Sequence, residues 1–410
     1  MDVKQSPVPD GYKQTDVGVI PEDWEVVHIG SIASFSSGSG ISVASLQGES
    51  SDNPVPVFGG NGVAGFTNRS ILREPTVVVG RVGQKCGEIY LTFGPAWITD
   101  NALYPRVKHC KYDIHFFALA LNSAGLNDVK NRNDLPLVTQ TILHSVQIPW
   151  TRNVEEQTAI ATALSDVDSL LDALDRLIAK KRDLKQAAMQ QLLTGQKRLP
   201  GFGGEWEVKR IGTFTDCTAG GTPSTLVPSY WGGSIPWMNS GELNLKLVED
   251  VDGRVTEKGL NNSSTKMIPR KCVLIGLAGQ GKTRGTVAMN LTELCTNQSI
   301  AAIFPNSSFA PEYLYHNLDA RYDELRELSS GDGGRGGLNL TIIKAIEVAF
   351  PPLSEQTAIA AILSDMDAEL SALEQRRDKT RAIKQGMMQE LLTGKTRLVP
   401  PNHSEGSAHG

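Results

Sequence analysis

The sequence predicts an α+β fold in which two globular blocks of mixed strands and helices are each followed by a long helix. The first observation is an internal repeat, because Glu156–Leu199 returns without a gap as Glu355–Leu398, at a constant shift of 199 residues. The second is that valine and isoleucine runs broken by Gly, Asn and Pro fill the stretches before both copies, a pattern typical of strands and turns. A repeat at a fixed shift indicates internal duplication. We therefore expect a pseudo-twofold chain.

The repeat divides the chain into five segments. Both globular blocks open with Trp-Glu-Val, at Trp24 and at Trp206, which places the start of the second block shortly after the first repeat. The expected segments are a first block at 1–153, a helical segment at 154–199, a second block at 200–353, a second helical segment at 354–399 and a tail at 400–410.

Within each block, strand-like stretches come first and a helix follows. In the first block the strands are expected within 54–66, 76–91 and 96–107, and a helix near 113–124. In the second block they are expected within 220–243, 272–289 and 293–304, and a helix near 311–328.

The repeated segments have the spacing of paired helices. Apolar residues three and four apart form a narrow seam of the kind that coiled coils bury. The seam residues are Leu164, Val167, Leu171, Leu174, Ile178, Leu363, Met366, Leu370 and Leu373. Gly195 and Gly394 lie where a left-handed C-terminal cap ends a helix. Ser165 and Ser364, each with an aspartate three residues later, leave open a break into a short and a long helix. The spacing leaves open both the helix direction and a four-helix bundle.

Composition limits the classes of function. The net charge of −5 argues against a protein that coats nucleic acid by bulk electrostatics, so local clusters or a partner must supply phosphate neutralisation. The five cysteines are far apart without metal-ligand spacing, as in a reduced cytoplasmic protein. The sequence has no long apolar run, so no membrane span is predicted.

One catalytic motif match is a phosphate-loop pattern. Gly276–Thr283 fits G-x-x-x-x-G-K-[ST] after a strand-like run. A phosphate site needs a helix next, whose N-terminal amides hold the phosphates, but residues 284–289 have the pattern of a second strand. We interpret the stretch as a glycine-rich hairpin.

A second match is Phe58-Gly59-Gly60-Asn61-Gly62, which fits the F-x-G-x-G loop of amino-methyltransferases. Those enzymes also need an Asn/Asp-Pro-Pro-aromatic tetrapeptide. The Pro-Pro pairs at 351–352 and 400–401 lack the preceding amide or carboxylate. Methyl transfer by this chain alone is therefore not expected.

Several stretches together carry a family resemblance. They are GYKQTDVGVIPEDWEVVHIG at 11–30, GGTPS…YW…IPW at 220–237, and FPPLSEQTAIA and LLTGKTRL around the second helix. In this order, and with the helical repeat after both blocks, the chain resembles the specificity subunit of type I restriction-modification systems over nearly its whole length. The first junction departs from the pattern, because Ile-Pro-Trp-Thr-Arg-Asn-Val at 148–154 replaces the shorter Pro-Pro-Leu run.

The resemblance implies a function and a set of partners. Each block would be a target-recognition domain that reads one half of a split site in double-stranded DNA. The helices would pair antiparallel, set the spacing and dock two modification subunits. Those partners would bind S-adenosylmethionine and methylate adenine, and restriction or motor subunits using ATP with Mg would join for cleavage. The chain itself would be a non-catalytic subunit without cofactor or metal, acting in the cytoplasm and not at a membrane.

Candidate base-reading residues follow from the chemistry of the DNA grooves. Arg and Lys pair with guanine, and Asn and Gln pair with adenine. In the first block the candidates are Asn61, Arg81, Gln84, Lys85, Asn131, Arg132 and Asn133. In the second block they are Gln280, Lys282, Arg284, Arg335 and Asn339. Each is also explained by an ordinary solvated loop, and the neighbouring glycines by turns.

One alternative from another class stays open. A two-headed coiled-coil adaptor that binds proteins would keep the helices, but it would not need Arg, Lys and Asn on the loops of the blocks. Binding to DNA, measured with and without partner subunits, separates the two hypotheses.

Overall fold

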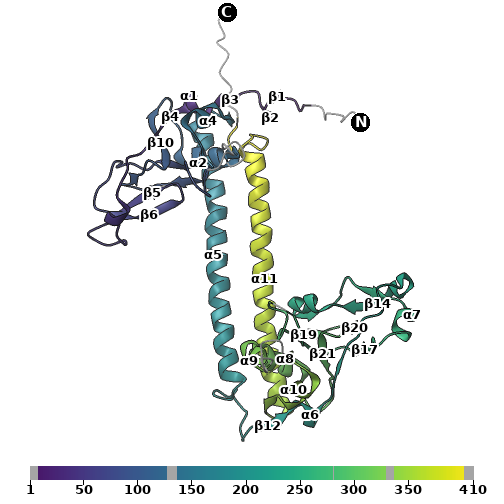
Figure 1. The fold of residues 1–410 in the computed structure, drawn as a ribbon. Helices are drawn as coiled ribbons and strands as arrows, with labels where there is room; N and C mark the ends of the chain where they lie inside the picture. Colours follow the sequence, from purple (N-terminus) through teal and green to yellow (C-terminus); the bar gives the residue numbers. More distant parts are fainter. Residues whose placement is uncertain (1–7, 127–135, 280, 329–336, 401–410) are drawn as a thin grey trace, which may run out of the picture. The chain divides into compact units, whose positions relative to one another are not determined.

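The computed structural model describes residues 8–126, 136–279, 281–328 and 337–400 of the chain. The chain forms two compact units (Figure 1). Unit 1 takes residues 1–174 and 376–410, and unit 2 takes residues 175–375. Each unit therefore combines one globular block with the beginning of one long helix and the end of the other.

Unit 1 combines small sheets with short helices, with strand orders β1-β2, β11-β3, β4-β10-β7-β8 and β6-β5-β9. The strands are β1 (Tyr12–Thr15), β2 (Gly18–Pro21), β3 (Glu25–His28), β4 (Ala33–Ser37), β5 (Val55–Gly59), β6 (Gly62–Thr67), β7 (Val77–Gly80), β8 (Ile89–Leu91), β9 (Trp97–Ile98), β10 (Ala102–Lys108) and β11 (Gln147–Trp150). The helices of the block are α1 (Ile29–Ile32), η1 (Val43–Ser45), α2 (Ile114–Ser123) and α4 (Gln140–Ser145).

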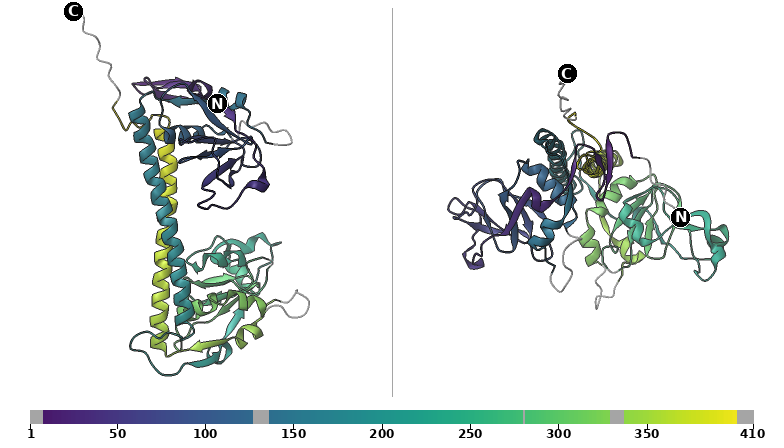
Figure 2. Two further views of the ribbon diagram at one scale, coloured as in Figure 1. Left: turned by 90° about the vertical axis from the view of Figure 1, so that its left-hand side faces the viewer. Right: turned by 90° about the horizontal axis from the view of Figure 1, so that it is seen from above.

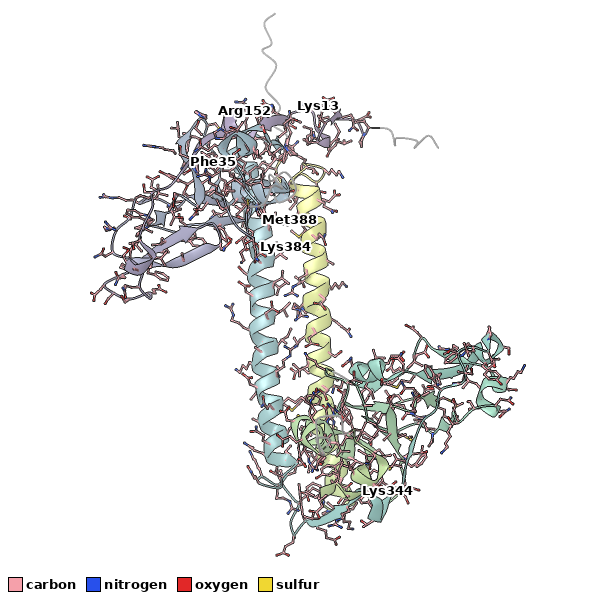
Figure 3. The ribbon with its side chains drawn as sticks, viewed as in Figure 1. Lys13, Phe35, Arg152, Lys344, Lys384 and Met388 are labelled. Carbon is pink, nitrogen blue, oxygen red and sulfur yellow. The ribbon has the colours of Figure 1, made fainter. Side chains whose placement is uncertain are left out.

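The core of unit 1 lies between α2, the β4-β10-β7-β8 sheet and the long helices. Helix α2 starts at Asp113, whose carboxylate accepts hydrogen bonds from the first free amides of the helix. Its Phe116 and Phe117 are fully buried, together with Phe35 of β4 (Figure 3). Burying a phenylalanine completely contributes about 2–3 kcal/mol. The helix expected near 113–124 is confirmed.

Unit 2 has the strand orders β12-β22, β13-β21-β18-β19-β15 and β16-β14-β20-β17. The strands are β12 (Glu207–Arg210), β13 (Cys217–Ala219), β14 (Trp231–Met238), β15 (Leu247–Val248), β16 (Arg254–Val255), β17 (Met267–Ile268), β18 (Val273–Gly276), β19 (Val287–Asn290), β20 (Leu294–Thr296), β21 (Ile300–Ile303) and β22 (Glu347–Phe350). The helices are α6 (Ile211–Phe214), η2 (Pro228–Tyr230), η3 (Ser240–Leu245), α7 (Glu257–Asn261), α8 (Pro311–Asp319), α9 (Tyr322–Glu327) and α10 (Leu340–Ala345).

The sheets of unit 2 lie to one side of its helix pair (Figure 2). Helix α8 lies beside α11, whereas β14, β17 and α7 are on the side of the block away from it (Figure 1). The core joins buried Tyr313, Leu314 and Leu318 of α8 to Ile359 and Leu363. The helical region expected at 311–328 is thus two short helices, α8 and α9.

The two blocks repeat one topology. The order β4-β10-β7-β8 returns as β13-β21-β18-β19, and the parallel pair β5 and β9 returns as β14 and β20. The duplication therefore extends through the blocks, beyond the helical segments where the sequence shows it. The α+β class with an internal repeat is confirmed.

The long helices are α5 (Val154–Leu192) and α11 (Leu353–Leu391), and each has 39 residues. Neither is broken near Ser165 or Ser364, because both serines lie inside continuous helix. The left-handed glycines expected after the helices are confirmed, with φ of 72° at Gly195 and 70° at Gly394. Asn153 accepts from the amides of the first turn of α5, while Pro352 precedes α11, so the two junctions differ in sequence but both start a helix.

Candidate functional site

A buried glutamate fixes the start of each long helix. Glu156 is fully buried in unit 1, where its carboxylate accepts from the indole Nε1 of Trp24 at 3.2 Å and from the hydroxyl of Thr151 at 3.0 Å. Arg397, from the end of the repeat, donates to both of its oxygens at 2.5 and 3.0 Å. A buried carboxylate is stable only when it is paired and hydrogen-bonded. These contacts meet that condition.

Unit 2 repeats this arrangement with the other copies. Glu355 accepts from the indole Nε1 of Trp206 at 3.1 Å and from Nε and Nη2 of Arg198, both at 2.6 Å. The hydrogen bond to Glu355 raises the pKa of Arg198, and this effect outweighs desolvation, which acts to lower it. The guanidinium also lies over the ring of Trp206 at 5.3 Å.

The glutamine that follows each glutamate ties the helix to the block. Gln157 accepts from the amide of Asp113 at 2.8 Å and donates to the carbonyl of Thr151 at 2.7 Å. Gln356 makes the matching bonds in unit 2, to Ala310 at 3.0 Å and to Pro351 at 2.8 Å. The repeated Glu-Gln and Arg-Leu dipeptides therefore make their contacts within each unit: the glutamate at the start of one long helix binds the arginine that follows the other. Their sequence pattern gave no sign of this pairing across the repeat.

The nine residues of the expected seam differ in burial. Five are buried, namely Leu164, Leu174, Ile178, Leu363 and Leu370. Four are half-buried, namely Val167, Leu171, Met366 and Leu373.

Ion pairs show the helix direction in unit 2. Lys181 pairs with Glu369 at 2.6 Å, and Lys185, one turn later in α5, pairs with Asp367, which lies earlier in α11. Because later residues of α5 meet earlier residues of α11, the two helices run antiparallel in this unit, as expected.

Unit 1 shows the same direction from the other ends. Lys384 pairs with Asp168 at 2.5 Å, and Met388 of α11 packs on the core cluster that contains Ile160 and Leu164 (Figure 3). The repeat, with its shift of 199 residues, relates Asp168 to Asp367 and Lys185 to Lys384, so the two ion pairs correspond. The ion pair is therefore part of the duplicated design.

Two loops of unit 1 bring four of the candidate base-reading residues together. Asn61 is exposed in the turn between β5 and β6, and its Oδ1 lies 3.3 Å from where a Cβ of Gly83 would be. Gln84 and Lys85 are exposed in the loop that contains this glycine. Arg81 begins the same loop, so Asn61, Arg81, Gln84 and Lys85 belong to one surface.

Hydrogen bonds hold this surface in place. Arg81 donates from Nη1 to Ser37 at 3.1 Å and to the carbonyl of Asp100 at 3.2 Å, and its amide donates to Asn101 at 3.0 Å. Asn61, Asp100 and Asn101 line a hollow of about 230 Å³. Arg81 therefore supports the strand turn at Asp100, and part of its donor set is used inside the unit.

Lys85 is also engaged within the loop. Its Nζ lies 3.7 Å from Glu88, whose other neighbour is the hydroxyl of Tyr90 at 2.8 Å. Burial and the contact with Glu88 raise the pKa of Tyr90 to about 12, so the phenol stays protonated and donates to the carboxylate. Lys85 is half exposed, and its exposed ion pair is weak enough to exchange for a phosphate or a base.

The phosphate-loop stretch is a hairpin. Strands β18 and β19 pair antiparallel from Val273–Met289 to Ile275–Val287, and turns, not a helix, follow Thr283. A Cβ on Gly276 would lie 2.2 Å from the carbonyl of Thr283, so this glycine permits the close turn. Lys282 is exposed at the turn, and its carbonyl accepts from Tyr322 of α9 at 3.1 Å. Arg284 is half-buried beside it.

Asn339 has a structural role. Its side chain accepts from the amide of Ile342 at 3.0 Å and caps α10, as Thr139 caps α4 in unit 1. The segment 337–339 before α10 lies close to the end of β18, because the amide of Leu338 donates to the carbonyl of Leu277 at 3.0 Å. The remaining candidates, Asn131, Arg132, Asn133, Gln280 and Arg335, lie outside the described residues.

Sequence reasoning missed the turn that the topology places beside these loops. In unit 1 it is Thr99–Asn101 after β9, and in unit 2 it is Asn297–Ser299 after β20. Gln298 is exposed there, and its Oε1 accepts from the hydroxyl of Thr222 at 2.5 Å. No motif marks either turn, and only the repeated strand order reveals that they correspond.

In the described parts of the chain, no helix is both long and apolar enough to cross a membrane.

Comparisons with known proteins agree with this architecture. A family model described as type I restriction modification DNA specificity domain matches residues 21–181 and 203–382. The chain is 31% identical over 168 residues to the type I restriction enzyme MjaIX specificity subunit of Methanocaldococcus jannaschii, a match covering 40% of this chain and 38% of that protein. It is 27% identical over 226 residues to the EcoR124I/EcoR124II specificity subunit of Escherichia coli, covering 54% and 55%. The matched part is thus less than two thirds of either relative.

Longer matches are more distant. The MjaVIII specificity subunit of Methanocaldococcus jannaschii is 23% identical over 415 residues, covering 92% of this chain and 94% of that protein. Among solved structures, the S subunit of a type I restriction-modification system from M. genitalium has a TM-score of 0.66 at 18% identity, covering 93% and 98%. At that identity the likeness shows the fold alone.

Proposed function

The chain belongs to the type I restriction-modification DNA specificity family, and from this premise we propose that each block reads one half of a bipartite target in double-stranded DNA. The observation that carries the proposal is the repeated topology of the two blocks. Each unit presents polar side chains on loops at corresponding strand ends, and the side chains differ between the units. Two similar scaffolds with different loop chemistry suit two half-sites of different sequence.

Each segment of the chain has its own role in this proposal. Residues 1–153 and 200–353 are the two target-recognition domains, and 154–199 and 354–399 connect them. The helices set the spacing between the half-sites and dock two modification subunits. Two copies of the Glu-Gln and Arg-Leu junction support a pair of equivalent docking places.

Charge supports a role inside a larger complex. The chain has a net charge of −5, and binding that depends on the DNA backbone needs clusters of Lys and Arg. We infer that the modification subunits neutralise much of the phosphate charge, while this chain supplies base contacts. The same partners bind S-adenosylmethionine and perform the methyl transfer, and restriction subunits with ATP and Mg add cleavage. This chain provides no catalytic group or cofactor in the proposal.

Domain exchange tests the proposal. Residues 202–353 are replaced by the same region of a relative, the hybrid is produced with its modification subunits, and methylated adenines are mapped across a genome. The expected result is a target in which one half changes and the other half stays. A hybrid in which both halves change together contradicts independent reading.

Insertion of one heptad in both helices, after Leu171 and after Leu370, tests the role in spacing. Seven residues lengthen a helix by about 10 Å, or about three base pairs. We expect methylation to move to half-sites with a longer gap, with some loss of activity because three base pairs also rotate the second half-site. Methylation that stays best at the original gap would show that the helices do not set it.

The second candidate, a two-headed protein adaptor, is distinguished by DNA binding. The complex of this chain with its modification subunits retards a duplex containing the mapped target under our proposal. An adaptor binds its protein partners equally well but gives no preference for one DNA sequence over another.

A further inference from the structure

Two of the three most exposed large apolar side chains among the described residues lie on corresponding loops of the two units. Leu226 is 90% exposed, Val43 is 82% exposed and Phe93 follows at 81%. Leu226 and Val43 belong to different units, and both lie on the loop that follows the first strand of the larger sheet, β13 or β4. Single exposed apolar residues are ordinary, but the same placement in both halves of a duplicated fold is not expected by chance.

The two loops correspond in their backbone contacts. A Cβ on Gly38 would lie 2.0 Å from the carbonyl of Ile98, and a Cβ on Gly220 would lie 2.1 Å from that of Thr296. The next amide donates to the same carbonyl in each unit, at 2.9 Å and 2.8 Å. Val43 comes five residues after Gly38 and begins η1, and Leu226 comes six residues after Gly220 in a turn before η2, so the two apolar tips follow corresponding glycines at nearly the same distance.

An indole holds each loop. Trp97 of β9 donates from Nε1 to the carbonyl of Ser39 at 2.9 Å, and Trp237 of β14 donates to that of Gly221 at 2.9 Å. These tryptophans come from strands that do not correspond in the repeat, β9 and β14, yet both bind the backbone at the corresponding place in the loop. In unit 2, Trp231 adds a bond to Ser224 at 3.2 Å and packs edge-on against Trp237 at 5.0 Å. These bonds hold the backbone of each loop four residues before Val43 and two residues before Leu226.

Each loop also contacts residues with amide side chains. Val43, Asn61 and Asn101 line the same hollow of about 230 Å³ in unit 1. In unit 2, the loop of Leu226 contacts the β20–β21 turn through Thr222 and Gln298. Each surface thus combines amide groups with one protruding aliphatic group.

On the basis of the proposed function, we propose that Leu226 and Val43 each contact the C5-methyl group of a thymine, one in each half of the target. The thymine methyl is the apolar group that base edges display in the major groove, and aliphatic side chains recognise it by contact. Asn61 and Asn101 beside Val43, and Gln298 on the turn that the Leu226 loop contacts through Thr222, are suited to neighbouring bases. A rigid loop loses little conformational freedom on binding, which makes one methyl contact effective.

Deoxyuridine tests the proposal, because it removes the thymine methyl and keeps the base pair. The chain is purified with its modification subunits, the target is taken from methylation mapping, and each thymine of the target is replaced singly by deoxyuridine. We expect about four-fold weaker binding at one position in each half-site, the effect of one buried methyl group. Leu226→Ala should weaken binding to the thymine duplex and abolish discrimination at one half-site, and Val43→Ala should do so at the other.

Val208→Ala is the matched control, since Val208 is 67% exposed on β12 of unit 2, outside the loop. It should keep full discrimination between thymine and deoxyuridine. Thermal unfolding of each variant verifies that the fold is kept, as expected for exposed side chains.

Three results of the DNA-binding experiment overturn the proposal while leaving the proposed function intact. These are a half-site without thymine in either strand, discrimination that persists in the Leu226→Ala or Val43→Ala complex, and specific binding that no deoxyuridine affects. Loss of a modification subunit from Leu226→Ala would instead assign the loop to protein contact and also overturns it. A complex that prefers no DNA sequence refutes the proposed function itself.

Discussion

The guanidinium of Arg397 connects two acidic side chains from distant parts of the chain. It donates to Glu156, 241 residues earlier, and through Nη1 and Nη2 to both oxygens of Asp23 at 2.8 and 2.9 Å. Burial acts to lower the pKa of Arg397, but the hydrogen bonds to Asp23 and Glu156 outweigh it and raise the pKa. The arginine is therefore always charged and serves as the counter-ion of a buried carboxylate.

Replacing Arg397 by methionine should destabilise unit 1 strongly. Removal of one partner of a buried pair leaves the other charge uncompensated, which costs about 3 kcal/mol. Hydrogen exchange of amides in α2 and at the start of α5 should accelerate, while amides of unit 2 keep their protection.

Two variants check this interpretation. Arg152→Met removes the exposed ion pair with Glu25 and should change exchange little, because exposed pairs are weak. The double variant Arg397→Met with Glu156→Gln should recover part of the lost protection, since the buried charge is gone. Equal exchange in the single and double variants would refute the role of the charge.

Charge exchange tests the helix direction in unit 1. Lys384→Glu places a second carboxylate beside Asp168 and should lower the stability of the unit by about 1 kcal/mol, as expected for a partly exposed pair. Adding Asp168→Lys restores opposite charges and should recover the loss. The double-mutant cycle is measured by urea unfolding at low and high salt, because screening weakens the coupling. Additive effects of the two changes would contradict contact between these residues.

His316 should make unit 2 sensitive to acid. It is buried, its Nε2 lies 3.1 Å from the hydroxyl of Ser364, and desolvation, with the charge of Lys185, lowers its pKa to about 4 against the opposing effect of Asp319 and Glu312. The unfolded chain binds a proton near pH 6.5, and the folded chain does not. Stability is therefore unaffected above pH 7 and falls as the pH drops from 6.5 towards 4, by about 2 kcal/mol at pH 5.

Leucine is the matched replacement for this histidine. The amides of Asp113 and Ala310 donate to corresponding glutamines, Gln157 and Gln356, so Asp113 corresponds to Ala310 in the repeat. Six residues further along each helix, Leu119 corresponds to His316. His316→Leu should remove this part of the acid sensitivity in urea unfolding measured from pH 7 to pH 4.5. Parallel curves for the wild type and the variant would show that the histidine does not titrate in this way.

Two glycines of one loop should differ in their response to alanine. A Cβ on Gly38 would lie 2.0 Å from the carbonyl of Ile98, whereas a Cβ on Gly40 would have no atom within 4 Å. Gly38→Ala should cost about 2 kcal/mol or more by forcing the backbone apart, and Gly40→Ala should change stability by less than about 0.5 kcal/mol. Urea unfolding with tryptophan fluorescence, which includes nearby Trp97, measures both. Similar midpoints for the two variants would contradict the close packing at Gly38.

Local and periodic features of the fold were predictable from the sequence. The left-handed caps at Gly195 and Gly394 follow from backbone chemistry at single residues. The hairpin after Gly276 follows from the strand-like pattern of residues 284–289. The contact of Arg397 with Glu156 was not predictable, because nothing in the spacing of two residues 241 apart indicates that they meet. The break that the sequence left open at Ser165 does not occur, because buried Leu164 before it and buried Leu174 after it favour one continuous helix over a new cap.

The candidate surface was predictable only in part. Residue chemistry selected Asn61 and Gln84, and only the structure shows that their loops lie together. The same chemistry selected Asn339, whose side chain is a helix cap, because an asparagine that caps and one that reads a base have the same sequence appearance. The turn at Gln298 carries no motif and emerges only when the two blocks are aligned by their strands.

The discontinuous make-up of unit 1 has a consequence for biosynthesis. A ribosome releases Trp24 and Glu156 long before Arg397, so unit 1 receives its counter-ion only after all of unit 2 has been translated. Unit 2 is contiguous from residue 175 to 375, and its arginine, Arg198, precedes Glu355. The nascent chain can therefore complete its second half first, and a premature stop after the second block would leave the N-terminal half, not the C-terminal half, without its final contacts.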